Sequence, residues 1–169
     1  MARMSWMDTT ASLGRLVAGQ DDARLSPGFD RTAAELYILT ALSPHLSSAQ
    51  RRAFPEETEV ADLAHNLNAD RNAALLEELE HVALALNAHG IIPVVFKGTA
   101  HILTGLWPTS GSRFVTDIDL LVSRPDLAQA YSTVSELTRE PSCLAIEDVA
   151  HPNHVPRIRR ADWPAAIEL

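Results

Sequence analysis

The sequence has little cysteine and no long apolar run. Cys143 is the single cysteine in 169 residues, which excludes an internal disulfide and a zinc site built from several cysteines. No segment approaches the roughly 20 consecutive apolar residues that a membrane-spanning helix needs. Arg15 interrupts the apolar stretch 11–18, so this stretch lacks the continuous apolar core of a signal peptide. The composition therefore predicts a soluble, cytoplasmic protein without a membrane partner.

Basic residues are also few. The chain has 14 Lys and Arg against 22 Asp and Glu, a formal net charge of −8. Broad binding to nucleic acid needs a basic surface, so this class is disfavoured, whereas a small basic pocket for a triphosphate is compatible with the charge. Arg157, Arg159 and Arg160 form the densest basic cluster. We interpret this cluster as a solvated face, with a patch that binds nucleic acid or an acidic partner as the less favoured alternative.

Apolar residues recur at helical spacing throughout the first half of the chain. The pattern predicts helices over residues 12–19, 29–42, 56–66 and 71–89. The last is the clearest, because Leu75, Leu79, Val82 and Leu86 share one face and Gly90 follows as a C-terminal cap. We expect this helix to bury its apolar stripe where the helical module meets the rest of the protein.

The segment 91–122 is organised around two neighbouring acidic side chains. It predicts, in order, a strand over 91–96, a turn at Lys97-Gly98, a helix over 99–106 and a strand over 117–122. Alternate side chains of a strand share a face, so Asp117 and Asp119 lie side by side while Ile118 and Leu120 face a core. Two carboxylates this close repel unless a cation lies between them. A hard, oxygen-preferring ion, Mg²⁺ or Mn²⁺, is the expected neutraliser.

The order of these features resembles the nucleotidyltransferase superfamily, which has the fold of DNA polymerase beta. The chain carries, in sequence, Lys97-Gly98, a short helix, Arg113, and Asp117-Ile118-Asp119. Within the superfamily it is most similar to a poorly characterised bacterial family with a strand ending in Lys-Gly and an Arg-x-x-x-Asp-x-Asp strand. The resemblance covers roughly residues 90–169. It implies an α+β fold, with a helical module over 1–89 and a small mixed-sheet nucleotidyltransferase core over 90–169.

The resemblance also implies a set of metal ligands. Superfamily members commonly add a third carboxylate from a neighbouring strand, and Glu168 stands at the matching position. Asp117, Asp119 and Glu168 are therefore the expected catalytic and metal-binding residues, with Mg²⁺ or Mn²⁺ as cofactor. Glu168 lies close to the last residue, where chains commonly fray. A naturally short form and a core truncated at this point are both left open.

Lys97, Gly98 and Arg113 are the expected triphosphate-binding residues. Lysine and arginine supply positive charge to phosphate oxygens, and glycine lets a phosphate approach the backbone at a helix start. Lys97 and Arg113 each have a structural alternative: Lys97 as a solvated lysine at a strand end, and Arg113 as a surface arginine paired with an acid. Gly111-Ser112 is similar to the superfamily's Gly-Ser phosphate motif, but it precedes the Asp-x-Asp strand directly, so we interpret it as a loop.

The implied function is metal-dependent transfer of a nucleoside monophosphate from a nucleoside triphosphate to an acceptor hydroxyl, with release of pyrophosphate. The acceptor is a small molecule, a peptide or protein side chain, or an RNA end, and the net charge of −8 favours the first two. A toxin-like transferase acting on tRNA or protein is an alternative, although Thr99 replaces the second glycine of such toxins. A non-catalytic binding module on a degenerate fold is another. The sequence leaves open the preferred base and the oligomeric state. It also leaves open the role of His151 and His154, whose spacing occurs in zinc sites but which have no evident third ligand.

Overall fold

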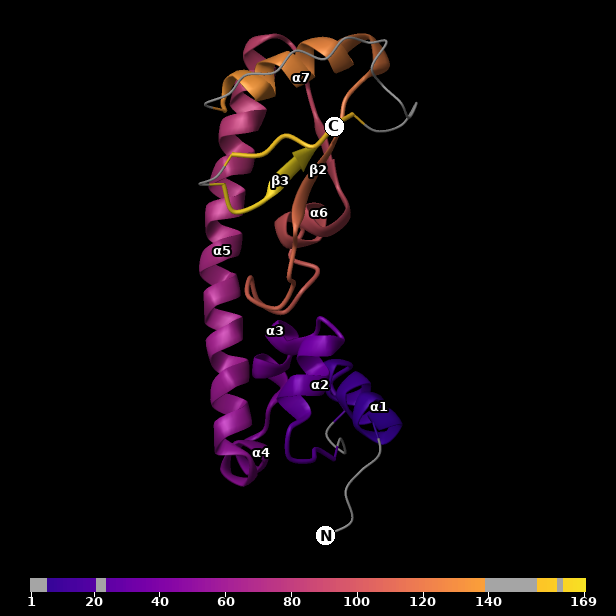
Figure 1. Ribbon diagram of the computed structural model, residues 1–169, viewed down its shortest axis with the longest axis vertical. Helices are drawn as coiled ribbons and strands as arrows, with labels where there is room; N and C mark the ends of the chain where they lie inside the picture. Colours follow the sequence, from indigo (N-terminus) through magenta and orange to yellow (C-terminus); the bar gives the residue numbers. More distant parts are fainter. Residues whose placement is uncertain (1–5, 21–23, 139–154, 161–162) are drawn as a thin grey trace. The chain divides into compact units, whose positions relative to one another are not determined.

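The computed structural model describes residues 6–20, 24–138, 155–160 and 163–169. The chain divides into two compact units, the first formed by residues 1–70 with 107–114 and the second by residues 71–106 with 115–169. This division falls inside a helix, whereas the sequence places a boundary at the end of that helix, between 89 and 90. The predicted α+β class is confirmed, because helices accompany a small mixed sheet (Figure 1).

Helix α5, Pro55–Ala88, contributes to both units. It starts at a proline, which suits a first helical turn because the missing N–H has no partner there, and Glu56 and Glu57 favour the positive N-terminal end. It ends at Ala88, two residues before Gly90, whose φ of +75° is accessible to glycine. The sequence predicts two helices over this range. The structure joins them because no glycine or proline lies between residues 66 and 71.

The first unit is helical. Its elements before α5 are α1 Trp6–Val17, α2 Phe29–Glu35, α3 Leu39–Leu42, η1 Ser43–His45 and α4 Ser48–Ala53. The single helix predicted over 29–42 is broken, since Tyr37 takes a positive φ of 57° that no helix continues through. Ser47 and Gln50 form a reciprocal capping box that starts α4. Leu13, Leu16 and Phe29 are central to the apolar core of this unit.

The second unit contains the sheet. Besides the end of α5, its elements are β1 Val94–Phe96, α6 Lys97–Leu103, β2 Asp117–Leu121, η2 Arg124–Asp126, α7 Leu127–Glu136 and β3 Ala166–Glu168. The strand order is β1-β2-β3, with β1 antiparallel and β3 parallel to β2. An isolated antiparallel bridge also pairs Ile158 with Ile167. Strand β1 starts only after Pro93, which has no N–H to give to a ladder.

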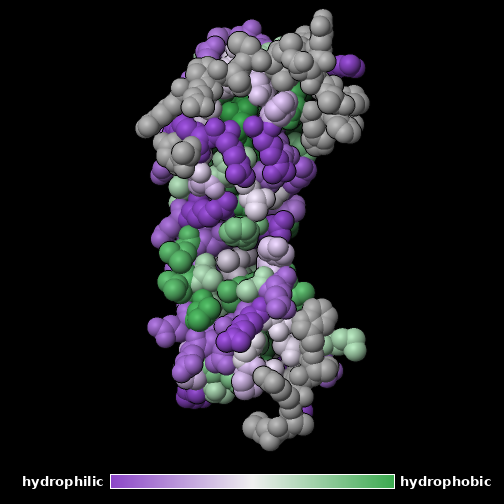
Figure 2. Space-filling model, in the orientation of Figure 1, coloured by the Kyte–Doolittle hydropathy of each residue, from purple (hydrophilic) through white to green (hydrophobic). Residues whose placement is uncertain are grey.

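One face of this sheet is apolar and buried. Ile118 and Ile167 are fully buried, and they belong to a core that includes Leu79 and Val82 of α5 and Val134 of α7. The burial predicted for the stripe on α5 is thereby confirmed. Alternation along β2 and β3 places Asp117, Asp119 and Glu168 on the opposite face. In Figure 2, hydrophilic groups gather over the region of β3.

No helix in the described ranges combines the length and the apolar content that a bilayer crossing requires.

Candidate active site

Three carboxylates meet on the polar face of the sheet. Asp117 and Asp119 project from β2 because Ile118 between them faces the core. The parallel register pairs Asp119 with Glu168 on β3. One carboxylate oxygen from each of the three residues lies within 4.8 Å of the others. One cation with ligands at about 2.0–2.6 Å can be reached from all three at such separations after side-chain adjustment.

These carboxylates differ in their access to solvent. The side chain of Asp119 is 3% exposed, that of Glu168 12% and that of Asp117 22%. Asp119, in the central strand, is flanked by Phe96 of β1 and by Glu168 of β3. Partial burial strengthens the repulsion among like charges, because solvent screens them less. The cluster therefore needs positive charge in contact with it.

Lys97 supplies the first positive charge. Its Nζ donates to Asp119 Oδ1 at 2.5 Å and lies 3.9 Å from Glu168 Oε2. The hydrogen bond to Asp119 raises the pKa of Lys97, with smaller contributions from the charges of Glu168 and Asp117. Lys97 is the first residue of α6 and has a φ of 52°, a left-handed conformation that costs a residue with a side chain about 1–2 kcal/mol. Such backbone strain concentrates at functional sites.

Arg157 supplies the second positive charge. Its Nε forms an ion pair with Glu168 Oε1, and its Nη2 lies 3.6 Å from Asp117 Oδ2. The bridge between Ile158 and Ile167 sets Arg157 directly across from Glu168. The sequence interpretation of this arginine as part of a solvated basic face does not include these ion pairs, although its side chain is 56% exposed. The alternation Arg157-Ile158-Arg159 is a weak strand-like signal, but it does not indicate which residues Arg157 contacts.

The donor set fits a hard divalent cation. Three carboxylates carry three negative charges against the two positive charges of Lys97 and Arg157. Carboxylate oxygens are the ligands that Mg²⁺ and Mn²⁺ prefer. Lys97 and Arg157 already contact some of these oxygens, so a metal ion bound there would have to share or displace those contacts.

Gly98 has a packing role in the structure. A Cβ at this position would lie 3.0 Å from Val115 Cγ2, closer than side chains normally approach. The next residue of α6, Thr99, is buried and donates from Oγ1 to the carbonyl of Asp117 at 3.2 Å. Close contact at Gly98 and this hydrogen bond together hold α6 against the start of β2. Binding of phosphate at Gly98 stays a prediction from the sequence.

Arg113 belongs to the first unit, whereas the other predicted site residues belong to the second. Its guanidinium carbon lies 5.9 Å from the centroid of the Trp107 ring. The carbonyls of Arg113 and Gly111 accept hydrogen bonds from the Asn68 side chain at 2.9 and 2.8 Å. A Cβ on Gly111 would come 2.5 Å from the carbonyl oxygen of His65. Close packing therefore explains this glycine, in keeping with its interpretation as a loop residue.

His151, His154 and Cys143 lie outside the described residues.

A family model described as an uncharacterised nucleotidyltransferase matches residues 26–140. That range contains Lys97, Gly98, Arg113, Asp117 and Asp119, and it ends before Arg157 and Glu168. No curated protein and no solved structure matches the chain.

Proposed function

The chain belongs to this uncharacterised nucleotidyltransferase family, and on that premise we propose that it transfers a nucleoside monophosphate from a nucleoside triphosphate to an acceptor hydroxyl. The observation that best supports this is the cluster of Asp117, Asp119 and Glu168, whose carboxylate oxygens lie within 4.8 Å of one another. Two of these residues lie within the matched range and one beyond it. Glu168 is therefore supported by geometry, and the two aspartates by geometry and family together.

In this proposal the three carboxylates hold Mg²⁺ or Mn²⁺. When bound, such an ion supplies positive charge to the phosphate oxygens and orients them for in-line displacement. The protein contributes rigidity: Ile118 and Ile167 are fully buried and fix the two strands from which the carboxylates project. A preorganised cluster of this kind needs little rearrangement when the substrate arrives.

The proposed transfer exchanges one phosphorus–oxygen bond for another. The acceptor hydroxyl oxygen bonds to the α-phosphorus, the bond from that phosphorus to the oxygen bridging the β-phosphate breaks, and pyrophosphate leaves with the electron pair. A carboxylate of the cluster accepts the hydroxyl proton and releases it to water. The Lys97 side chain is 53% exposed, so its ammonium group is open to an oxygen of the leaving pyrophosphate while it stays beside Asp119.

A binding module without catalysis is the second candidate. The observation that favours it is the pairing of Lys97 with Asp119 and of Arg157 with Glu168, which satisfies much of the cluster through the protein's own charges. Ion-pair networks of this kind also occur as purely structural features. The two candidates differ in whether a metal ion and a triphosphate bind together at the carboxylates.

Thermal unfolding with Mn²⁺ and each of the four nucleoside triphosphates tests the proposal. A ligand that binds the folded state raises its stability by RT ln(1 + [L]/Kd). At least one triphosphate with Mn²⁺ is expected to raise the melting temperature of the wild type, and Asp117→Asn is expected to abolish that rise. The proposal is contradicted if the melting temperature rises equally in both proteins. It is also contradicted if no triphosphate raises the melting temperature of the wild type. Release of pyrophosphate from the stabilising triphosphate then separates the enzyme from the binding module.

A further inference from the structure

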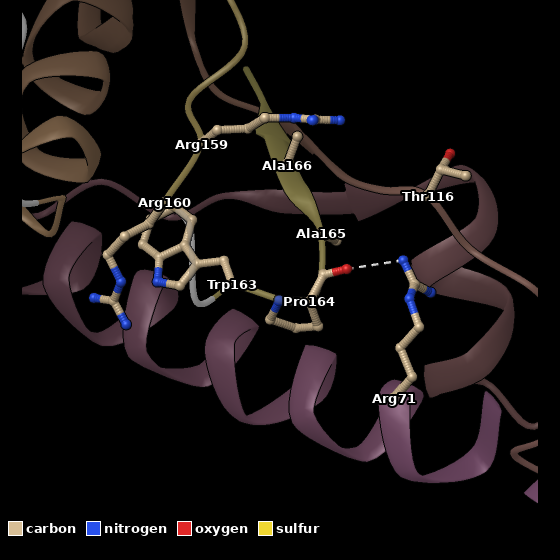
Figure 3. A pocket seen from close by; sticks show the side chains of 8 residues that line it. All are labelled: Arg71, Thr116, Arg159, Arg160, Trp163, Pro164, Ala165 and Ala166. Atoms are coloured by element: carbon tan, nitrogen blue, oxygen red, sulfur yellow. Dashed lines mark hydrogen bonds between the residues drawn. The ribbon is translucent and has the colours of Figure 1, made fainter. Parts of the chain in front are cut away.

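A cavity of about 420 Å³ lies within the second unit, and its lining is basic. Three arginines take part in it, together with a hydroxyl, an indole and small apolar side chains. The residues that matter to the argument are Arg71, Thr116, Arg159, Arg160, Trp163 and Ala166 (Figure 3). None of the described residues lining it is acidic, although the chain carries a net charge of −8. We call this cavity the arginine pocket.

The arginine pocket borders the carboxylate cluster at Asp117. Ala166 pairs with Asp117 in the register of β2 and β3, and Thr116 donates from Oγ1 to Asp117 Oδ1 at 3.2 Å. Arg159 and Ala166 are the neighbours, on the same side, of the isolated antiparallel bridge between Ile158 and Ile167, and both line the pocket. Lys97 meets the same cluster at Asp119, two positions further along β2. Positive side chains therefore reach the cluster region at both ends.

Arg159 is available for a ligand. Its side chain is exposed and makes no hydrogen bond or ion pair with the described parts of the chain. Figure 3 shows it extended over Ala166 toward the end of the pocket where Thr116 lies. A guanidinium binds phosphate oxygens through two parallel hydrogen bonds, which makes arginine the usual choice for anion recognition.

Arg71 and Arg160 are held in place by the protein. Arg71 donates to the carbonyls of Val115 and Pro164, the second at 2.9 Å, and burial lowers its pKa while leaving a guanidinium charged. Arg160 donates to the carbonyl of Leu137 at 3.0 Å, and its guanidinium carbon lies 5.0 Å from the Trp163 ring centroid. In Figure 3, Arg160 is directed away from Thr116, on the other side of Trp163. Arg159, with the fixed charge of Arg71 nearby, therefore defines the anion-binding end.

We propose that the arginine pocket binds the acceptor, and that the acceptor is a small molecule carrying a phosphate group as well as the reacting hydroxyl. The proposal rests on the nucleotidyl transfer proposed above. In-line displacement places the attacking hydroxyl and the leaving pyrophosphate on opposite sides of the α-phosphorus. Lys97, beside Asp119, binds the leaving pyrophosphate in this proposal. The arginine pocket, beside Asp117, therefore lies on the side from which the hydroxyl attacks.

Size and charge favour a small acceptor over RNA. A cavity of about 420 Å³ falls within the roughly 300–1,000 Å³ range of small-molecule sites. An RNA end would bring further phosphates against a chain with a net charge of −8, and RNA binding gains its affinity from an extended basic surface. A single phosphate needs one local cluster of cations, which the arginine pocket provides.

Inorganic phosphate in a buffer with EDTA is the minimal probe, with sodium chloride at matched ionic strength as its reference. Titration calorimetry of the wild type, Arg159→Gln and Arg52→Gln measures the dissociation constants. Arg52 is exposed in α4 of the first unit, so its replacement makes the same charge change away from the pocket. Loss of one charge-assisted contact is expected to weaken phosphate binding by about tenfold or more in Arg159→Gln, and less than about twofold in Arg52→Gln.

Thr116→Val is a second, nearly isosteric variant at the other edge of the pocket. Removal of a neutral hydroxyl contact is expected to weaken phosphate binding by about two- to tenfold. The inference is overturned if the wild type binds phosphate no more tightly than the sodium chloride reference. It is also overturned if Arg159→Gln and Arg52→Gln weaken phosphate binding equally. Tighter Arg159-dependent binding of a short RNA than of phosphate overturns the choice of a small acceptor.

Two cross-measurements keep this inference separable from the proposed transfer. Arg159→Gln is expected to retain the melting-temperature rise with Mn²⁺ and triphosphate, and Asp117→Asn is expected to retain phosphate binding in EDTA. If Arg159→Gln loses the rise, the pocket holds the donor triphosphate and the acceptor assignment is wrong. If the wild type shows no rise but binds phosphate through Arg159, the proposed transfer and the acceptor role fall together, while the anion site stands.

Discussion

The two faces of the same short strands have opposite physical characters. On one face, Ile118 and Ile167 are fully buried in a core with α5 and α7. On the other face lie the carboxylates of Asp117, Asp119 and Glu168, with one oxygen from each within 4.8 Å of the others. The first face lowers the free energy of the folded state by removing apolar surface from water, whereas the second raises it through repulsion. A sheet of three strands can carry such a site because its other face supplies the stability.

Breaking the apolar face should have the largest effect. Ile118→Ala removes a fully buried side chain and leaves a cavity, so we expect a loss of about 2–5 kcal/mol in the free energy of unfolding. Leu121→Ala is the matched control, because Leu121 lies in the same strand and is 60% exposed. Denaturant unfolding should show a loss below about 1 kcal/mol for this control. Equal losses in both would contradict the assignment of the two faces.

Removing one of the cluster's cations should have a moderate effect that a metal ion reverses. Arg157→Gln leaves Lys97 alone against three carboxylates, and we expect a loss of about 1 kcal/mol in EDTA, reduced by the exposure of the arginine. Mn²⁺ replaces the missing charge, so it should raise the melting temperature of the variant more than that of the wild type. An equal rise in the two proteins would show that Arg157 and the metal do not compete for the same carboxylates.

The close contact at Gly98 should appear as a coupling between two residues. An added methyl group in Gly98→Ala meets Val115 at 3.0 Å, while alanine favours the helix by up to about 1 kcal/mol. We expect Gly98→Ala to be more favourable by about 0.5–1 kcal/mol when Val115→Ala has first made room. A double-mutant cycle from denaturant unfolding measures this coupling. A value near zero would mean that packing does not explain the glycine, and the phosphate-binding role would then gain weight.

The smallest effect concerns alkaline pH. The hydrogen bond to Asp119 raises the pKa of Lys97 above its ordinary value of 10.5, so its stabilising contribution is complete below about pH 10 and is lost as the pH rises through the raised value. The contribution should stay below about 1 kcal/mol because the lysine is exposed. The difference in unfolding free energy between the wild type and Lys97→Gln should shrink between about pH 10 and pH 12. A difference that stays constant over this interval would contradict the ion pair.

Local patterns predicted much of this architecture. Alternation around Ile118 placed Asp117 and Asp119 on one face, and Gly90 marked the end of α5, because both features depend on neighbouring residues in the chain. The break at Tyr37 was missed, since a tyrosine with positive φ has no compositional signal.

Long-range contacts were the part that local patterns could not supply. Arg157 joins the cluster through a bridge that depends on tertiary pairing. The segment 107–114 belongs to the first unit, where the Asn68 side chain holds the carbonyls of Gly111 and Arg113. Side-chain bonds to distant backbone groups follow no sequence period, so no spacing rule identifies them.

The pairing of β3 with β2 has a consequence for the order of folding. β1, α6 and β2 follow one another closely along the chain, whereas Glu168 reaches Asp119 across roughly fifty residues, a loop closure that costs about 3–4 kcal/mol in chain entropy. Contacts of long sequence separation tend to form after local ones. The third carboxylate therefore joins the first two as Ile167 enters a core that is already forming. The repulsion among the three charges opposes the last stage of folding rather than its nucleation.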